Sequence, residues 1–249
     1  MPFLADHLAR SFINRLKCMP KRLACLLPCQ CALCGDVAEY PLCAACDLQY
    51  FRTSAQRCPR CGIPMSRQAS ATNCAACLRH PPAFDATIAV TDYTPPIDQL
   101  VLALKFGRQL ALAPAFSHLM ERAIYDAGIP RPDMLIAVPL GRKRLVERGF
   151  NQSLEMARHL AKTLELPLEK QCLVRRRETM PQSLLPPKER RRNIKHAFTA
   201  DYRALDKIKG KHIAIVDDVM TTGETLHEAA ATLKRFGAAR VTNMVFARA

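Results

Sequence analysis

Apolar and polar positions follow two different periods along the second half of the chain. Short apolar runs bounded by turn residues are typical of buried strands, and they span residues 86–93, 134–138, 213–216 and 241–246. Segments with helical spacing of apolar residues lie between them, one beginning at Ile97 and the others spanning 110–126, 152–165 and 224–236. This alternation predicts an α/β fold over residues 81–249, in which a mostly parallel sheet carries helices on both faces.

The run from Ile213 to Thr225 places polar residues where a central strand would end. Parallel sheets bind ligands beyond the carboxyl ends of their strands. Asp217 and Asp218 follow the apolar run, and a turn rich in threonine then leads into a helix. The N–H groups and the dipole of a helix N-terminus hold a phosphate. We therefore assign substrate binding, with a phosphate at the helix N-terminus, to Val219, Met220, Thr221, Thr222, Gly223, Glu224 and Thr225.

The two carboxylates cannot face that phosphate, because like charges repel. They are better placed beside it, where they would accept hydrogen bonds from a vicinal diol such as a ribose. We expect Asp217 and Asp218 to face solvent in the empty site, and we expect their replacement to change stability little. The alternative interpretation of this stretch is an ordinary strand, turn and capped helix.

Two basic segments are predicted to join this site. The first is a basic loop over 139–150 whose cations suit a pyrophosphate, and its leading residues are Pro139, Leu140, Gly141 and Arg142. The second, over 175–195, holds eight basic and two acidic residues together with three prolines. We interpret it as a long loop that closes over the site and not as a regular helix throughout, with a passive loop as the alternative.

Eight of the 12 cysteines form four C-x-x-C pairs, and these are Cys31/Cys34, Cys43/Cys46, Cys58/Cys61 and Cys74/Cys77. Two such pairs complete a tetrahedral thiolate shell, so the spacing predicts two structural Zn²⁺ ions. Disulfides or an iron–sulfur cluster are the alternatives, and disulfides would need an oxidising compartment. Sequential and interleaved pairing both remain open, and Cys29 is close enough to Cys31 to compete as a ligand.

These patterns divide the chain into three parts. Residues 1–27 form a basic amphipathic segment, residues 28–80 a double zinc ribbon, and residues 81–249 the α/β domain. The cysteine module is too poor in apolar residues to fold without its metal. No apolar run reaches the length of about 18 residues that a membrane span needs, and no signal peptide is evident, so we expect a cytoplasmic protein.

The charge balance narrows the class of ligand. The chain carries a formal net charge of +15 at pH 7. Such an excess implies a polyanionic ligand, which could be nucleic acid, a pyrophosphate-bearing substrate or both. The alternative is that the charge is merely solvated.

The stretch from Val216 to Thr225 resembles the phosphoribosyl-pyrophosphate motif of type I phosphoribosyltransferases. Nearly the whole chain is similar to the ComF family, whose members are competence-associated phosphoribosyltransferase-like proteins with an N-terminal double zinc ribbon. The resemblance rests on that stretch, on the cysteine module and on Leu104-Lys105-Phe106, Arg148-Gly149-Phe150-Asn151-Gln152, Thr179-x-x-Gln182-x-x-Leu185 and Arg190-x-x-Asn193. It implies a type I phosphoribosyltransferase-like sheet and a cytoplasmic role in the uptake of single-stranded DNA.

The resemblance also implies residue roles. Asp217 and Asp218 would hold the ribose hydroxyls, with Arg177 as the third catalytic residue on a flexible loop that reaches Arg190. Residues 221–225 would hold the 5′-phosphate and residues 139–142 the pyrophosphate. Lys105, Gln182 and Arg190 would join in substrate binding, and Mg²⁺ would accompany phosphoribosyl pyrophosphate.

Three functions are consistent with these patterns. The first is a transferase acting at C1 of phosphoribosyl pyrophosphate with an unknown acceptor, in the service of single-stranded DNA uptake or processing. The second is a nucleic-acid-binding protein with a catalytically inactive phosphoribosyltransferase fold, and the third is a zinc adaptor. Competence or DNA-processing proteins are possible partners. We expect any cover over an acceptor base to come from the N-terminal half, which argues against ordinary purine salvage.

Overall fold

The computed structural model describes residues 29–52, 56–66, 73–107, 109–177 and 186–249 of the chain. These residues form two compact units that divide between Asp47 and Leu48. In the first unit, strands β1 (Cys29–Gln30) and β2 (Val37–Ala38) pair as an antiparallel hairpin. Helix α3 (Ala44–Phe51) follows and runs across the division. The predicted amphipathic segment 1–27 lies outside the described residues.

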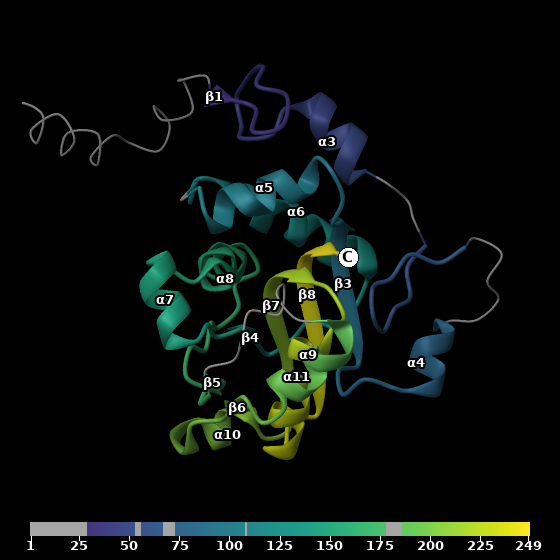
Figure 1. The fold of residues 1–249 in the computed structure, drawn as a ribbon, viewed down its shortest axis with the longest axis vertical. Helices are drawn as coiled ribbons and strands as arrows, with labels where there is room; N and C mark the ends of the chain where they lie inside the picture. Colours follow the sequence, from purple (N-terminus) through teal and green to yellow (C-terminus); the bar gives the residue numbers. More distant parts are fainter. Residues whose placement is uncertain (1–28, 53–55, 67–72, 108, 178–185) are drawn as a thin grey trace, which may run out of the picture. The chain divides into compact units, whose positions relative to one another are not determined.

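A four-stranded parallel sheet organises the second unit, in the order β3, β8, β7, β4 (Figure 1). The strands are β3 (Ala86–Asp92), β4 (Met134–Ala137), β7 (His212–Met220) and β8 (Arg240–Arg248). The central pair, β7 and β8, is buried along nearly its whole length. Burial of parallel strands on both faces requires helices on both sides. The predicted parallel α/β fold is confirmed.

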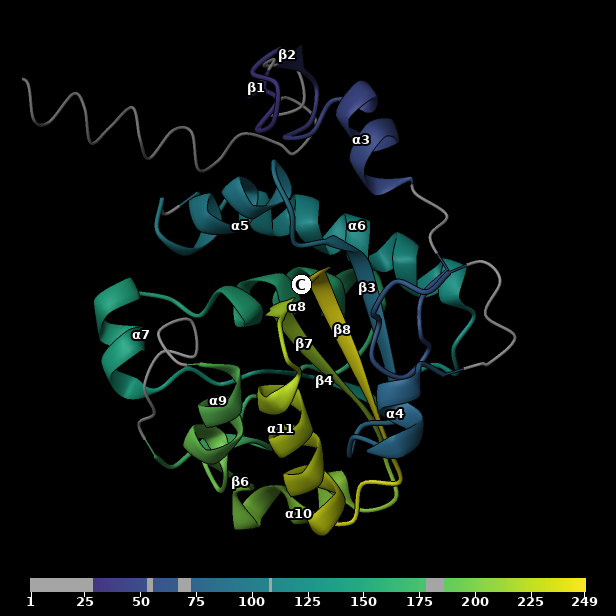
Figure 2. The ribbon, with the colours of Figure 1, turned by 45° about the vertical axis from the view of Figure 1, so that its right-hand side comes forward.

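Four helices supply most of this cover, and they are α5 (Ile97–Lys105), α6 (Leu112–Ala127), α8 (Gln152–Thr163) and α11 (Glu224–Arg235). Helices α6 and α8 pack together against the sheet, and Ser117 Oγ on α6 donates a hydrogen bond of 2.9 Å to the carbonyl of Met156 on α8. The ring of Phe116 stacks on that of Phe246 in β8, with 3.7 Å between centroids. Helix α11 packs against β8 and against α9 (Pro187–Ile194), and Figure 2 shows it across the sheet from α8.

The remaining elements are short. They are α4 (Ala75–Arg79), α7 (Arg142–Arg148), the antiparallel pair β5 (Val174–Arg175) and β6 (Phe198–Thr199), the 3₁₀ helix η2 (Tyr202–Ala204) and α10 (Leu205–Ile208). In the part of the chain that the structure describes, no helix has the length and apolar character needed to cross a membrane.

Two segments differ from the sequence-based expectation. The predicted basic loop over 139–150 was wrong for its middle part, because residues Arg142–Arg148 form α7. Arginine, lysine, leucine and glutamate are good helix formers, and glycines at both ends set the limits of the helix. In the basic segment 175–195, a helix covers Pro187–Ile194, with proline at its favoured first position. Each of the two basic segments therefore contains a helix where the sequence indicated a loop.

Candidate functional site

The acidic pair lies inside strand β7 and not after it. Pairing between β7 and β8 continues as far as Met220 and Arg248, four residues beyond the apolar run. The strand therefore carries both carboxylates into the interior, where Asp217 is 9% and Asp218 4% exposed. The expectation that they face solvent was wrong, and the reason is this longer strand pairing.

Each carboxylate has a partner from a different helix. Ser153 Oγ, at the start of α8, donates a hydrogen bond of 2.8 Å to Asp217 Oδ1. Lys105 Nζ, at the end of α5, lies 2.8 Å from Asp218 Oδ2. The sequence predicted Lys105 as a site residue but missed Ser153. Ser153 lies in the first turn of a helix that follows a parallel strand, and this position in the sequence could have identified it as a site residue.

The electrostatics of the pair leave it ready to accept further hydrogen bonds. Burial, and after it the neighbouring Asp218 carboxylate, raises the pKa of Asp217 to about 7. Ser153 and Lys105 act in the opposite direction. Apart from its ion pair with Lys105, Asp218 Oδ2 has no hydrogen-bond partner within the described residues. A buried carboxylate oxygen with spare acceptor capacity suits a ligand hydroxyl or a divalent cation.

The turn after β7 forms the predicted phosphate loop, which we define as residues 221–225. Gly223 precedes α11 with a left-handed φ of +81°. A Cβ at this position would lie 2.6 Å from Cε at the end of the Met220 side chain, which would have to shift, but it is the left-handed backbone that favours glycine here. The first N–H groups of α11 have no acceptor within the helix, and the helix dipole is positive at this end. The loop can therefore receive an anion.

The predicted pyrophosphate loop follows β4, the neighbour of β7 in the sheet. Asn151 fixes the start of this loop, since its Nδ2 donates a hydrogen bond of 3.0 Å to the carbonyl of Val138 and its Oδ1 caps α8. Of its residues, Gly141 is buried and Arg142, the first residue of α7, is exposed. Because parallel neighbours end at the same edge, Pro139, Leu140 and Gly141 leave the sheet beside the acidic pair.

Arg148 links two further residues near the site, Phe106 and Gln152. The guanidinium of Arg148, the last residue of α7, lies 5.1 Å from the ring centroid of Phe106. It also donates a hydrogen bond to Gln152 Oε1. The motif from Arg148 to Gln152 therefore joins the end of α7 to the end of α5.

The basic segment 175–195 is only partly described. Arg177 Nη2 donates hydrogen bonds of 2.7 and 2.9 Å to the carbonyls of Asn193 and Lys195. Arg177 would have to leave these carbonyls to act at a reaction centre. Gln182 lies outside the described residues, and so does the side chain of Arg190, whose backbone belongs to α9.

The eight predicted cysteine ligands form two groups of four, paired sequentially. In each group the sulfur atoms all lie within 4.8 Å of one another: Cys31, Cys34, Cys43 and Cys46, and then Cys58, Cys61, Cys74 and Cys77. We call these the first and the second cysteine cluster. The Sγ atoms of Cys34 and Cys43 are 3.7 Å apart, and those of Cys61 and Cys74 are 3.6 Å apart. Tetrahedral Zn–S bonds of about 2.3 Å would set sulfur atoms about 3.8 Å apart, so both groups fit Zn²⁺.

Backbone N–H groups prepare both clusters for a metal. The N–H of Cys43 donates a hydrogen bond to Cys31 Sγ, with 3.4 Å between nitrogen and sulfur. The N–H of Cys74 donates one to Cys58 Sγ, with 3.3 Å between these atoms. Burial raises the pKa of Cys58, but hydrogen bonds from the backbone groups of Cys74, Cys61 and Arg60 outweigh it and lower the pKa to about 7. A lowered pKa favours the thiolate, which is the form that binds metal. Cys29 belongs to neither cluster.

Comparisons with known proteins agree with this geometry. The sequence model of the phosphoribosyl transferase domain family matches residues 151–249, which include the acidic pair and the phosphate loop. The chain is 36% identical over 222 residues to the DNA utilization protein YhgH of Escherichia coli K12, covering 86% of this chain and 95% of that protein. It is 30% identical over 217 residues to Competence protein F of Haemophilus influenzae, covering 86% and 93%. This chain belongs to the ComF family.

The more distant relatives follow the same pattern. Competence protein ComFC of Bacillus subtilis is 25% identical to this ComF protein over 245 residues, covering 91% of this chain and 95% of that one. Among solved structures, glutamine phosphoribosylpyrophosphate amidotransferase of B. subtilis aligns with a TM-score of 0.36 at 18% identity, over 54% of this chain and 26% of that one. That score is too low to carry an argument, and the fold assignment rests on the sheet and on the family match.

Proposed function

We propose that this ComF protein binds phosphoribosyl pyrophosphate with Mg²⁺ between its acidic pair and its phosphate loop. The observation that carries the proposal is the buried pair Asp217 and Asp218, which stands directly before an anion-receiving helix N-terminus. The order of the two features suits a ligand that carries a vicinal diol and a phosphate on one small ring, as ribose 5-phosphate does. Residues 139–142, which follow the neighbouring strand β4, would receive the pyrophosphate, with Lys105 and Arg148 as flanking cations.

The reaction that fits this site is transfer of the phosphoribosyl group. An acceptor attacks C1 of the ribose, the bond from C1 to the pyrophosphate oxygen breaks, and pyrophosphate leaves with the electron pair. The positive charge that develops at C1 would be stabilised by the ionised acidic pair, which is electrostatic catalysis by fixed groups. Arg177, Gln182 and Arg190 belong to the segment that would close over the bound substrate. The two cysteine clusters would hold one structural Zn²⁺ each.

Calorimetry tests the binding step. Phosphoribosyl pyrophosphate with Mg²⁺ should bind wild-type protein, and the double variant Asp217→Asn, Asp218→Asn should bind at least tenfold more weakly, because charge-assisted hydrogen bonds contribute about 1.5–3 kcal/mol each. Replacing Asp126, an exposed residue on α6, by Asn is the matched control and should leave the affinity unchanged. Equal affinities for the wild-type protein and the double variant would refute the proposal.

A second proposal concerns single-stranded DNA. The printed names of the relatives refer to DNA utilization and competence. In this chain, α7 and α9 together hold eight basic residues and two acidic ones close to the site in sequence: Arg142, Lys143, Arg144, Arg148, Lys188, Arg190, Arg191 and Arg192 against Glu147 and Glu189. These cations exceed what one pyrophosphate can engage, so α7 and α9 would also neutralise backbone phosphates of a nucleic acid. Competence or DNA-processing proteins are the partners this role implies.

A further inference from the structure

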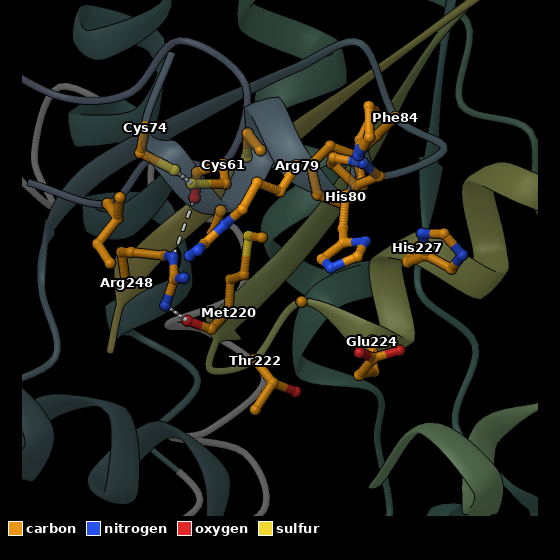
Figure 3. A pocket seen from close by; sticks show the side chains of 16 residues that line it. Cys61, Cys74, Arg79, His80, Phe84, Met220, Thr222, Glu224, His227 and Arg248 are labelled. Atoms are coloured by element: carbon orange, nitrogen blue, oxygen red, sulfur yellow. Dashed lines mark hydrogen bonds between the residues drawn. The ribbon is translucent and has the colours of Figure 1, made fainter. Parts of the chain in front are cut away.

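Arg248, at the end of strand β8, bridges the second cysteine cluster and the phosphate loop. Its side chain is buried, and Nε donates a hydrogen bond of 3.0 Å to the carbonyl of Cys61. Nη1 donates a hydrogen bond of 3.2 Å to the carbonyl of Met220 (Figure 3) and one of 2.5 Å to the carbonyl of Thr221. One guanidinium therefore holds a backbone group of a metal ligand and two backbone groups at the entry to the phosphate loop.

The second cysteine cluster is fixed on the sheet by more than this arginine. The N–H of Thr87 in β3 donates 2.9 Å to the carbonyl of Pro59, between the first two ligands. Arg57 Nη1 donates 3.0 Å to the carbonyl of Gly62 and 2.8 Å to Asp92 Oδ1. A Cβ at Gly62 would lie 3.1 Å from Thr87 Cγ2, so the hairpin and the strand are in close contact. The cluster can therefore serve as a firm support.

The phosphate loop has open space on the side that faces this cluster. A cavity of about 560 Å³ separates the loop from α4, and its wall includes Met220, Thr222, Gly223, His80 and His227 (Figure 3). The hydrogen bonds from Arg248 restrain the loop backbone on the side of this cavity, together with the N–H of Ala249, which donates a hydrogen bond of 3.0 Å to the carbonyl of Met220. Loss of the Arg248 bonds would weaken this restraint, most of all at Thr221.

Charge explains why the metal would matter to Arg248. A Zn²⁺ ion held by four thiolates leaves a net charge of about −2 on the cluster. A buried guanidinium is stable only when it is paired and hydrogen-bonded. The metal-bound cluster would supply the balancing charge, and its loss would also release the Cys61 carbonyl from its position.

We propose that Arg248 couples metal binding at the second cysteine cluster to the shape of the phosphate loop. Metal at the second cluster, and not at the first, then sets the affinity for the phosphoribosyl group. The inference rests on the proposed function of the loop as a phosphate site. Arg248 acts as a positioning residue, since it reaches the ligand only through the loop backbone.

A mutant cycle tests the coupling. Cys74→Ser removes a ligand of the second cluster, Cys43→Ser removes the corresponding ligand of the first, and Arg248→Met removes the guanidinium. With ribose 5-phosphate as the probe in calorimetry, Cys74→Ser and Arg248→Met should each lose at least tenfold in affinity, and Cys43→Ser should stay within twofold of wild type. Arg248→Met should retain about two zinc ions per chain. The double variant Cys74→Ser, Arg248→Met should bind no more weakly than the weaker single variant, because both changes break one linkage.

Hydrogen–deuterium exchange of residues 219–226 gives a readout independent of ligand. Exchange there should rise in Cys74→Ser and in Arg248→Met and stay unchanged in Cys43→Ser. Equal effects of the two cysteine variants, or additive losses in the double variant, would overturn the coupling. If ribose 5-phosphate fails to bind the wild-type protein, the proposed function fails, and the exchange pattern still decides whether Arg248 couples cluster and loop. Should Arg248→Met fold poorly, Arg248→Lys keeps the charge with fewer donors and should give an intermediate exchange rate.

Discussion

Lys105 Nζ and Asp218 Oδ2 lie 2.8 Å apart, so the end of α5 is joined by an ion pair to the strand that carries the acidic pair. Only 19% of the lysine side chain and 5% of the aspartate side chain are exposed. The lysine cation offsets one of the two negative charges that the adjacent buried carboxylates would otherwise carry. Access of a cation or a diol to Asp218 therefore involves Lys105 directly.

The Lys105→Met variant should lose stability. It removes the ion-paired cation of a buried carboxylate, and breaking a buried pair costs about 3–5 kcal/mol, which partial exposure of the lysine and the nearby Arg148 cation reduce to about 2 kcal/mol. Urea unfolding measures the change. Lys207→Met is the control, because its partner Glu169 is 2.9 Å away but the lysine is 55% exposed, and such surface pairs contribute about 0–1 kcal/mol. Equal losses in the two variants would mean that the Lys105 pair is in effect solvated.

The pH dependence of stability should reveal Asp217. Its pKa is about 7 in the folded protein and about 3.9 in an unfolded chain. The folded state thus keeps a proton that the unfolded chain releases, so the wild-type protein loses stability as pH rises from about 4 to 7. An asparagine at this position can still accept the hydrogen bond from Ser153 but never ionises. Relative to wild type, Asp217→Asn should gain more than about 1 kcal/mol at pH 8, and the gain should shrink toward pH 5 in thermal melts.

The control for this pH trend is Asp126→Asn, which changes an exposed carboxylate on α6. It should follow the wild-type stability curve between pH 5 and 8. A difference between Asp217→Asn and the wild-type protein that does not vary with pH would show that the aspartate is already ionised throughout this range.

Metal content should follow the two clusters separately. Protein purified without chelator should contain about two zinc ions per chain. Cys34→Ser should reduce this to about one and should leave the second unit folded, because the two sets of ligands do not share a residue. Atomic absorption and circular dichroism measure the two quantities. Loss of both ions from this single variant would contradict independent sequential sites.

Binding of single-stranded DNA should depend steeply on salt. Each phosphate contact adds about 0.7 to the log–log slope, so four contacts would give a slope near −3. Replacing Arg190, Arg191 and Arg192 by Ala should flatten the slope without changing zinc content. A matched control removes three charges by replacing Lys207, Lys209 and Lys211, which precede the amino end of β7 and lie away from the site edge. If the wild-type protein does not retard single-stranded DNA in a salt-dependent way, the basic residues of α7 and α9 would serve only to close over substrate.

The sequence predicted those features that depend on local pattern. The strand that begins at the apolar run, the threonine-rich turn and the helix from Glu224 are all found, because a short apolar run followed by a glycine turn has few other structures available. The spacing of the cysteines identified the eight ligands, but their sequential pairing needed three-dimensional positions. Neither spacing nor composition distinguishes sequential from interleaved arrangements.

Features that depend on distant neighbours could not be predicted. Burial of Asp217 and Asp218 follows from strand pairing with residues 245–248, and the partner Ser153 lies far away in sequence. Arg248 looked like an ordinary basic residue at the end of an apolar strand. Its role follows from the carbonyls of Cys61, Met220 and Thr221 meeting at one point, and no linear pattern records that meeting.

The two metal hairpins have the same local design, with glycine after the second cysteine, at Gly35 in the first and Gly62 in the second. No described atom lies within 4 Å of a Cβ placed at Gly35, whereas a Cβ at Gly62 would press on Thr87. The two turns are therefore under different structural constraint. In the first, glycine is needed for a left-handed backbone with φ +79°, and a side chain there would meet no described atom. The second must also preserve its fit to β3 and Arg248, so its sequence should change slowly for as long as the loop it supports is in use.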